Sequence, residues 1–147
     1  MQDASFEKVH YSDTPLYGPK KLILCGFPQG VSGNMEKVLK MAGISDVPVV
    51  WADSSHLDQL LSELLQLAHG SEGGKKDSAL PRAIIVSGIT ENQLHALMAI
   101  CRQTGMQKAL WATLTPTSEN WTLGKLLGEL EAERKALSQY EKNADTP

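Results

Sequence analysis

One pattern constrains the fold of this chain more than any other: short apolar runs alternate with stretches of helical periodicity. The apolar runs have the length of buried strands, and the stretches between them carry apolar residues at the spacing of one helix face. Strands are expected over residues 21–27, 47–52, 82–89 and 109–115, and helices over residues 35–42, 57–68, 90–105 and 121–140. Because such alternation favours a parallel sheet between helical layers, we predict a three-layer α/β fold with a four-stranded, mainly parallel sheet.

The two halves of this pattern also match each other in sequence. Residues 22–70 align without a gap with the residues 62 positions further on, so that Gly26 meets Gly88 and Gly43 meets Gly105. Any two units of this kind share some apolar matches, and coincidence is therefore one interpretation. Matched glycines at both the strand end and the helix end favour a duplication, in which two βαβα repeats share one sheet.

The pattern also divides the chain into segments. We expect an N-terminal arm (1–20), a first half (21–70), a Gly-rich charged linker (71–80), a second half (81–140) and a polar tail (141–147). Right-handed crossovers within each half predict the strand order 2-1-3-4. A ferredoxin-like or otherwise mixed sheet is the structural alternative.

In an open parallel sheet of this order, ligands bind at the carboxyl ends of the strands where the order reverses. That crevice would lie between strands one and three. Its predicted ligand-binding residues are Gly26, Phe27 and Gln29 from the first half, Ser87, Gly88 and Thr90 from the second, and Asn120 and Trp121 nearby.

Two of these residues lie at the start of the expected final helix. Asn120 is expected to cap it, and Trp121 to stand in its first turn. Trp121 is either a hydrophobic staple that fixes the entry of the helix or an aromatic platform at the rim of the crevice. Thr90 is expected to form a capping box with Gln93 at the preceding helix.

A glycine-rich stretch over residues 24–34 raises the question of a phosphate site. Its glycines, Gly26, Gly30 and Gly33, lack both the lysine of a phosphate-binding loop and the spacing of a dinucleotide fingerprint. A helix N-terminus attracts anions only weakly by itself. A tight turn is therefore the simpler interpretation, and we predict no cofactor.

Catalytic and metal-binding patterns are missing from the sequence. The four histidines have no zinc-type spacing, and no acidic pair follows the first strand. Cys25 and Ser87 stand at strand ends where a nucleophile could lie, but the sequence supplies neither with a base. We predict no catalytic residue and no metal site, with Cys25 a buried small hydrophobe; an enzyme with an unrecognised site at Cys25 or Ser87 is a further alternative.

Charge and hydropathy exclude two classes of partner. The net charge is −3 and the pI about 5.8, which gives no basic surface for nucleic acid. No apolar run reaches the roughly 20 residues of a membrane span. Cys25 and Cys101 lie inside expected elements, and residues 1–5 do not resemble a signal peptide, so we expect a cytoplasmic protein with reduced thiols.

The second half carries a family resemblance. It rests on Ile84-Ile85-Val86-Ser87-Gly88, on the helix from Thr90 to Gly105, on Thr115-Pro116-Thr117, and on Asn120-Trp121-Thr122-Leu123 with the Leu126-Leu127-Gly128-Glu129-Leu130 that follows. Over residues 81–134 the chain resembles domain-of-unknown-function family 3783, a small bacterial domain. The resemblance implies a soluble bacterial domain and adds no catalytic residue, because the family brings no established activity.

The final helix is longer than a four-stranded sheet requires. Leu137 and Tyr140 would project beyond the sheet and serve a homodimer or another protein partner. The sequence therefore favours a non-enzymatic interaction or regulatory module. The alternative is a small-molecule or anion binder at the crevice between strands one and three.

Overall fold

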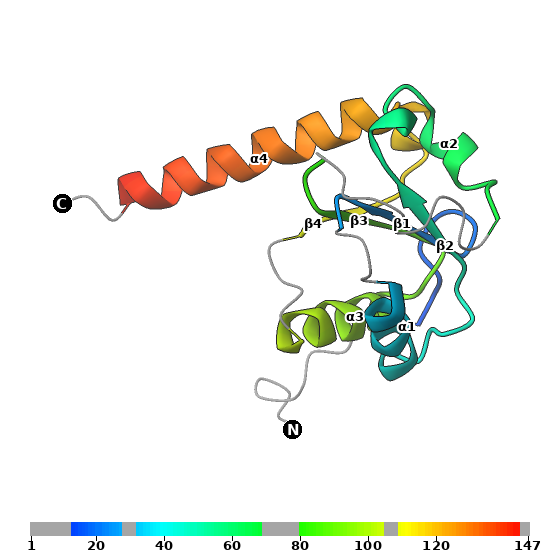
Figure 1. Cartoon of the computed structure of the whole chain (residues 1–147). Coiled ribbons are helices and arrows are strands. Elements are labelled where there is room, and N and C mark those ends of the chain that lie inside the picture. The colour runs from blue at the N-terminus through cyan, green and yellow to red at the C-terminus, as the bar shows by residue number, and fades with distance from the viewer. Residues whose placement is uncertain (1–12, 28–31, 69–79, 105–108, 145–147) are drawn as a thin grey trace.

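The computed structural model shows a four-stranded sheet between two layers of helices (Figure 1). It describes residues 13–27, 32–68, 80–104 and 109–144, with the backbone alone for residues 32–33 and 138–144. The elements in chain order are β1 Lys21–Cys25, α1 Ser32–Met41, β2 Val49–Ala52, the 3-10 turn η2 Ser54–His56, α2 Leu61–Leu64, β3 Ala83–Ser87, α3 Glu91–Gln103, β4 Leu110–Thr113, the 3-10 turn η3 Ser118–Asn120 and α4 Leu123–Ala144.

The strand order β2-β1-β3-β4 confirms the predicted order. Strands β1 and β2 are parallel, as are β3 and β4, but β1 and β3 are antiparallel. The prediction of a mainly parallel sheet is therefore wrong, and the mixed alternative is correct. Each half forms one parallel unit, and β1 and β3 join the two units in opposite directions.

The two parallel pairs share one register. In the first pair Leu22 lies opposite Val49, and in the second Ala83 lies opposite Leu110. In both cases the partner residue is 27 positions further along the chain. The central pair is in register over its full length, from Lys21 opposite Ser87 to Cys25 opposite Ala83. The sheet is thus built from two units of equal geometry.

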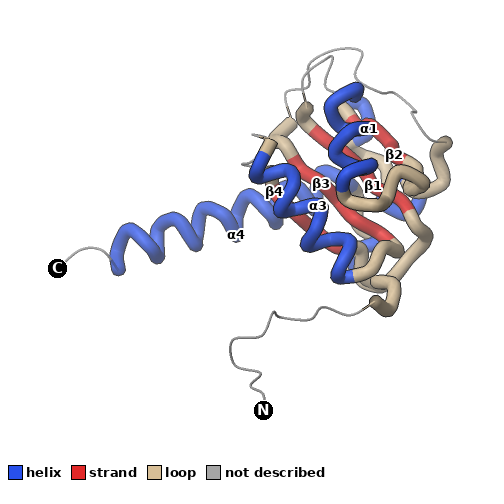
Figure 2. The backbone as a smooth tube through the Cα atoms, turned by 90° about the horizontal axis from the view of Figure 1, so that it is seen from below, coloured by secondary structure: helices blue, strands red, loops and turns tan. Residues whose placement is uncertain are grey.

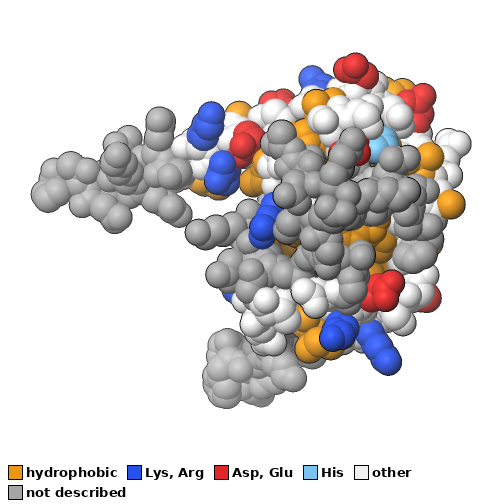
Figure 3. All heavy atoms as spheres, in the orientation of Figure 1, with side chains coloured by type: hydrophobic (Ala, Val, Ile, Leu, Met, Phe, Trp, Pro, Cys, Tyr) orange, Lys and Arg blue, Asp and Glu red, His pale blue; other side chains and the backbone are white. Residues whose placement is uncertain are grey.

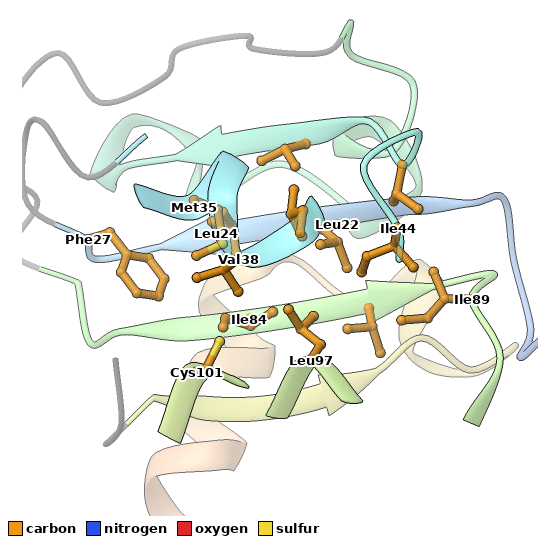
Figure 4. Close-up of a cluster of buried hydrophobic side chains, with 14 of the residues drawn as sticks. Leu22, Leu24, Phe27, Met35, Val38, Ile44, Ile84, Ile89, Leu97 and Cys101 are labelled. Carbon is orange, nitrogen blue, oxygen red and sulfur yellow. The ribbon is translucent and has the colours of Figure 1, made fainter. Parts of the chain in front are cut away.

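Helices α1 and α3 cover one face of the sheet (Figure 2). Alternate residues of the central strands point to this face, because successive side chains of a strand lie on opposite sides. The buried cluster under these helices includes Leu22, Leu24, Phe27, Met35, Val38, Ile44, Ile84, Ile89, Leu97 and Cys101 (Figure 4).

Helices α2 and α4 cover the other face. Ile23 and Ile85 point to it and are fully buried. They pack with leucines of the two helices, Leu61, Leu64, Leu65, Leu123, Leu126 and Leu127. Each unit therefore contributes the same kind of helix to the same face.

The continuous helix expected over residues 57–68 is replaced by η2 and the short α2. Leu60 between them is extended, with φ −73° and ψ 149°. It forms an antiparallel bridge with Thr122, and Leu61 N–H donates to the carbonyl of Trp121 at 2.9 Å. The bridge holds Leu60 out of the helical conformation despite the favourable leucine spacing.

Candidate functional site

The structure places the two sides of the predicted crevice at opposite ends of the two central strands, β1 and β3. Since Lys21 at the start of β1 lies opposite Ser87 at the end of β3, the carboxyl ends of these strands point in opposite directions. Four residue steps separate Lys21 from Cys25, or roughly 13 Å. Gly26 and Phe27 are therefore not brought together with Ser87, Gly88 and Thr90, and Gln29 lies outside the described residues.

At the end of β1, Gly26 turns the chain tightly against the segment that leads into β3. Its φ is 75°, and a Cβ there would lie 2.4 Å from the carbonyl oxygen of Pro81. The buried Phe27 ring packs edge-on against Trp51 at 6.4 Å and lies beneath the Arg82 guanidinium at 5.8 Å. These contacts account for Gly26 and Phe27 as structural residues.

At the end of β3, the segment before β1 runs across the strand. Leu16 N–H donates to the carbonyl of Ile89 at 2.7 Å, and Gly88 N–H donates to that of Tyr17 at 3.2 Å. Ser87 is fully buried beneath this segment, and its hydroxyl has no hydrogen-bond partner in the described part of the chain. The interpretation of residues 1–20 as an arm does not anticipate this cover.

The Thr90 side chain serves α3. Its hydroxyl accepts from Gln93 N–H at 3.0 Å while the Gln93 amide oxygen accepts from Thr90 N–H at 2.9 Å. The predicted capping box is thereby confirmed. It satisfies two backbone donors at the helix start.

Asn120 does not cap α4, contrary to the prediction. It ends η3 and is exposed, whereas Thr122 accepts from Lys125 N–H at 3.1 Å at the start of the helix. Trp121 stands two positions before α4 and packs, half-buried, on the core beneath this face. The Lys125 ammonium lies 4.8 Å from the centre of its ring. The contacts of Trp121 agree with a hydrophobic staple.

A groove runs along α4 from Trp121. Its volume is about 360 Å³, and its lining residues are Trp121, Leu126, Glu129, Leu130, Ala132, Glu133 and Ala136. Acidic and basic side chains lie side by side where this helix leaves the body of the molecule (Figure 3). Two further hollows, of about 270 and 260 Å³, border α1 and contain none of the predicted site residues. The groove is the hollow that includes Trp121.

Both cysteines are free, buried thiols. Burial raises the pKa of Cys25 to about 12 and that of Cys101 to about 11. A thiol with such a pKa stays protonated at neutral pH and is a poor nucleophile. Within the described residues, no group of three histidine, cysteine or acidic side chains is arranged to hold a metal ion.

These features define an α/β unit in which β1 and β3 each end in a tightly packed glycine and a groove runs along the last helix. Residues 82–137, from β3 into α4, match the family model described as a domain of unknown function (DUF3783). No curated protein matches the chain. No solved structure matches it either. Among its described helices, none combines the length and apolarity needed to cross a bilayer.

Proposed function

We propose that this protein is a non-enzymatic interaction module whose docking surface is the part of α4 beyond the sheet. One observation carries the proposal: α4 spans 22 residues, whereas α2, which packs on the same face, spans 4. Figure 1 shows the distal half of α4 reaching away from the rest of the molecule. The sheet itself does not require that length.

The two helices show how much of α4 the core uses. α2 buries Leu61 and Leu64, and α4 buries Leu123, Leu126 and Leu127. Beyond Leu130 the helix is exposed from Ala132 to Leu137. A helix that extends past its own core without covering apolar surface adds little to stability by itself.

The exposed part of α4 continues the apolar stripe of the buried part. Leu130 and Leu137 follow Leu123 at seven-residue spacing, and Leu137 is 63% exposed. The groove beside them has an apolar floor and the carboxylates of Glu129 and Glu133 on its lining. Such a surface fits a helical segment with an apolar ridge and basic flanks.

A second copy of α4 has these properties. Arg134 lies on the same exposed stretch as Glu129 and Glu133, so the helix carries both charge signs that a self-pairing surface requires. We therefore propose self-association through α4 as the first interaction to test. We further propose a bacterial cytoplasmic setting, which the family resemblance and the free thiols Cys25 and Cys101 support.

The test compares Leu137→Asp with Lys135→Gln by sedimentation velocity over a range of protein concentrations. Both substitutions change the charge by −1, but residue 135 lies on the opposite side of the helix from residue 137. Tyr140, the other predicted contact, is kept unchanged, because its side chain lies outside the described part of α4. We expect the wild type and Lys135→Gln to associate and Leu137→Asp to stay monomeric, with the melting temperature that the wild type shows when dilute enough to be monomeric. A wild type that stays monomeric at all concentrations would contradict self-pairing through α4.

A further inference from the structure

The antiparallel pair at the centre of the sheet has a register that relates the two halves to each other. Ile23 lies opposite Ile85, its own counterpart 62 positions further on. Leu22 lies opposite Val86, and Leu24 lies opposite Ile84. Ile84 is the counterpart of Leu22 and Val86 is the counterpart of Leu24, so exchanging the two halves converts one pair into the other. Such a register is what a two-fold axis midway between Ile23 and Ile85 produces.

A second contact far along the chain obeys the same relation. Leu60 bridges Thr122, again its counterpart at 62 positions. The flanking hydrogen bonds are reciprocal: Leu61 N–H donates to Trp121 and Leu123 N–H to Gln59, both at 2.9 Å. The same axis therefore passes between the two helix starts.

The strand ends supply a third, independent contact. Gly26 and Gly88 have φ values of 75° and 73°. A Cβ at Gly26 would lie 2.6 Å from the carbonyl carbon of Pro81, and one at Gly88 would lie 2.6 Å from that of Pro19. Pro19 and Pro81 are also 62 positions apart, so each unit clamps the other in the same way.

We infer that residues 19–68 and 81–130 are two copies of one self-complementary unit, and that the surface of either unit which holds its neighbour will accept a second copy of itself. The chain is then the single-chain equivalent of a two-fold dimer. β1 of the first unit pairs with β3 of the second, so neither strand is left as an exposed apolar edge. An exposed apolar edge strand would pair with other chains. The interface between the units is distinct from the exposed part of α4 that we propose as a docking surface.

The family match agrees with this division, because it spans residues 82–137 and so covers the second unit without the first. The units differ where the interface does not reach: α2 ends at Leu64, and α4 continues to Ala144. An interface that lies on β1, β3 and the helix starts is unaffected by that difference.

The test is a full-length tandem variant in which residues 81–130 replace residues 19–68 and all other residues are kept. We expect a soluble monomer with one cooperative thermal transition and the far-ultraviolet circular dichroism of the wild type. The matched control is the same tandem with Ile85→Asp in both copies. It places two carboxylates opposite each other at the fully buried centre of the interface, and we expect it not to fold.

Two further variants make the outcome decisive. The first places Ile85→Cys in both copies of the tandem, with the other cysteines replaced by alanine, because paired strands bring Cα atoms within disulfide distance. Oxidation of the folded monomer should form an intramolecular disulfide, and a folded monomer that forms none overturns the inference. The second is the reciprocal tandem, with residues 19–68 in place of 81–130. Folding of either tandem supports the inference, and failure of both overturns it.

Discussion

Gly88 packs directly on Gly18: a Cβ at Gly88 would lie 2.6 Å from the Gly18 carbonyl oxygen. The φ of Gly88 is 73°, in the left-handed region that side chains disfavour. Gly88→Ala therefore meets both backbone strain and a backbone clash that neither segment can relieve by turning a side chain. We expect a loss of more than about 3 kcal/mol in the free energy of unfolding, as the sum of these two costs.

Gly43 provides the matched control. Its φ is 78°, but a Cβ added at Gly43 would meet nothing within 4 Å, so Gly43→Ala meets the backbone strain alone. We expect it to cost about 1–2 kcal/mol. Urea denaturation of the two variants measures the difference, and equal losses would show that the segment over β3 does not press on Gly88 as described.

The buried hydroxyl of Ser87 predicts a stabilising substitution. The hydroxyl is removed from water without a hydrogen-bond partner in the described residues, which costs about 1–3 kcal/mol. Ser87→Ala removes that hydroxyl and leaves almost the same shape. We expect the free energy of unfolding to rise by about 1 kcal/mol. A clear loss of stability in urea would mean that the hydroxyl has a partner, such as a bound water.

The sequence predicted the strand order because it depends on contacts within each half. Short crossovers fix β1 beside β2 and β3 beside β4, and the shared sheet then leaves β1 and β3 in the centre. The direction of β3 relative to β1 has no such signal. Both strands are apolar on both faces, as KLILC and AIIVS show, and an apolar strand pairs well in either direction.

The candidate crevice required β1 and β3 to run in the same direction. Because they are antiparallel, its two sides lie at opposite ends of these strands. Pro19 and Pro81 match at the same 62-residue shift just before the aligned region and therefore occupy equivalent positions in the two halves. This match supports the repeat but is compatible with either direction of β3. The extended Leu60 is different, because only its bridge to Thr122, a contact distant in sequence, explains it.

The raised pKa of Cys25 predicts an inert thiol in the folded protein. With a pKa of about 12, almost no thiolate is present at pH 8. We expect iodoacetamide to leave Cys25 unmodified in native protein and to modify it fully in denaturant, as read by mass spectrometry of the peptide that contains Cys25. Rapid native labelling of Cys25 would revive the enzyme alternative.

The same burial makes stability fall at high pH. The folded chain keeps both thiol protons to about pH 11, whereas the unfolded chain loses them near the ordinary value of 9.0. The unfolded state thus binds fewer protons above pH 9, and the free energy of unfolding falls as the pH rises. The hydrogen bond to Glu119 raises the pKa of Tyr17 and acts in the same direction. Between pH 8 and 11 the melting temperature should therefore fall less steeply with pH for the double variant Cys25→Ala/Cys101→Ala than for the wild type. The double variant keeps Tyr17, so some of the fall remains.

Gly128 and Gly124 predict opposite responses on one helix. A Cβ at Gly128 meets nothing within 4 Å, whereas one at Gly124 would lie 3.2 Å from the carbonyl oxygen of Leu57. Gly128→Ala should stabilise the protein by about 1 kcal/mol, since alanine favours a helix and loses less backbone entropy on folding. Gly124→Ala gains the same helix propensity but crowds the Leu57 carbonyl oxygen, which accepts a hydrogen bond from Gly124 N–H at 3.0 Å. Thermal melting should therefore rise for Gly128→Ala and fall for Gly124→Ala. A rise in both would show that α4 has room to move away from η2, and that the close approach at Gly124 is not required by the packing.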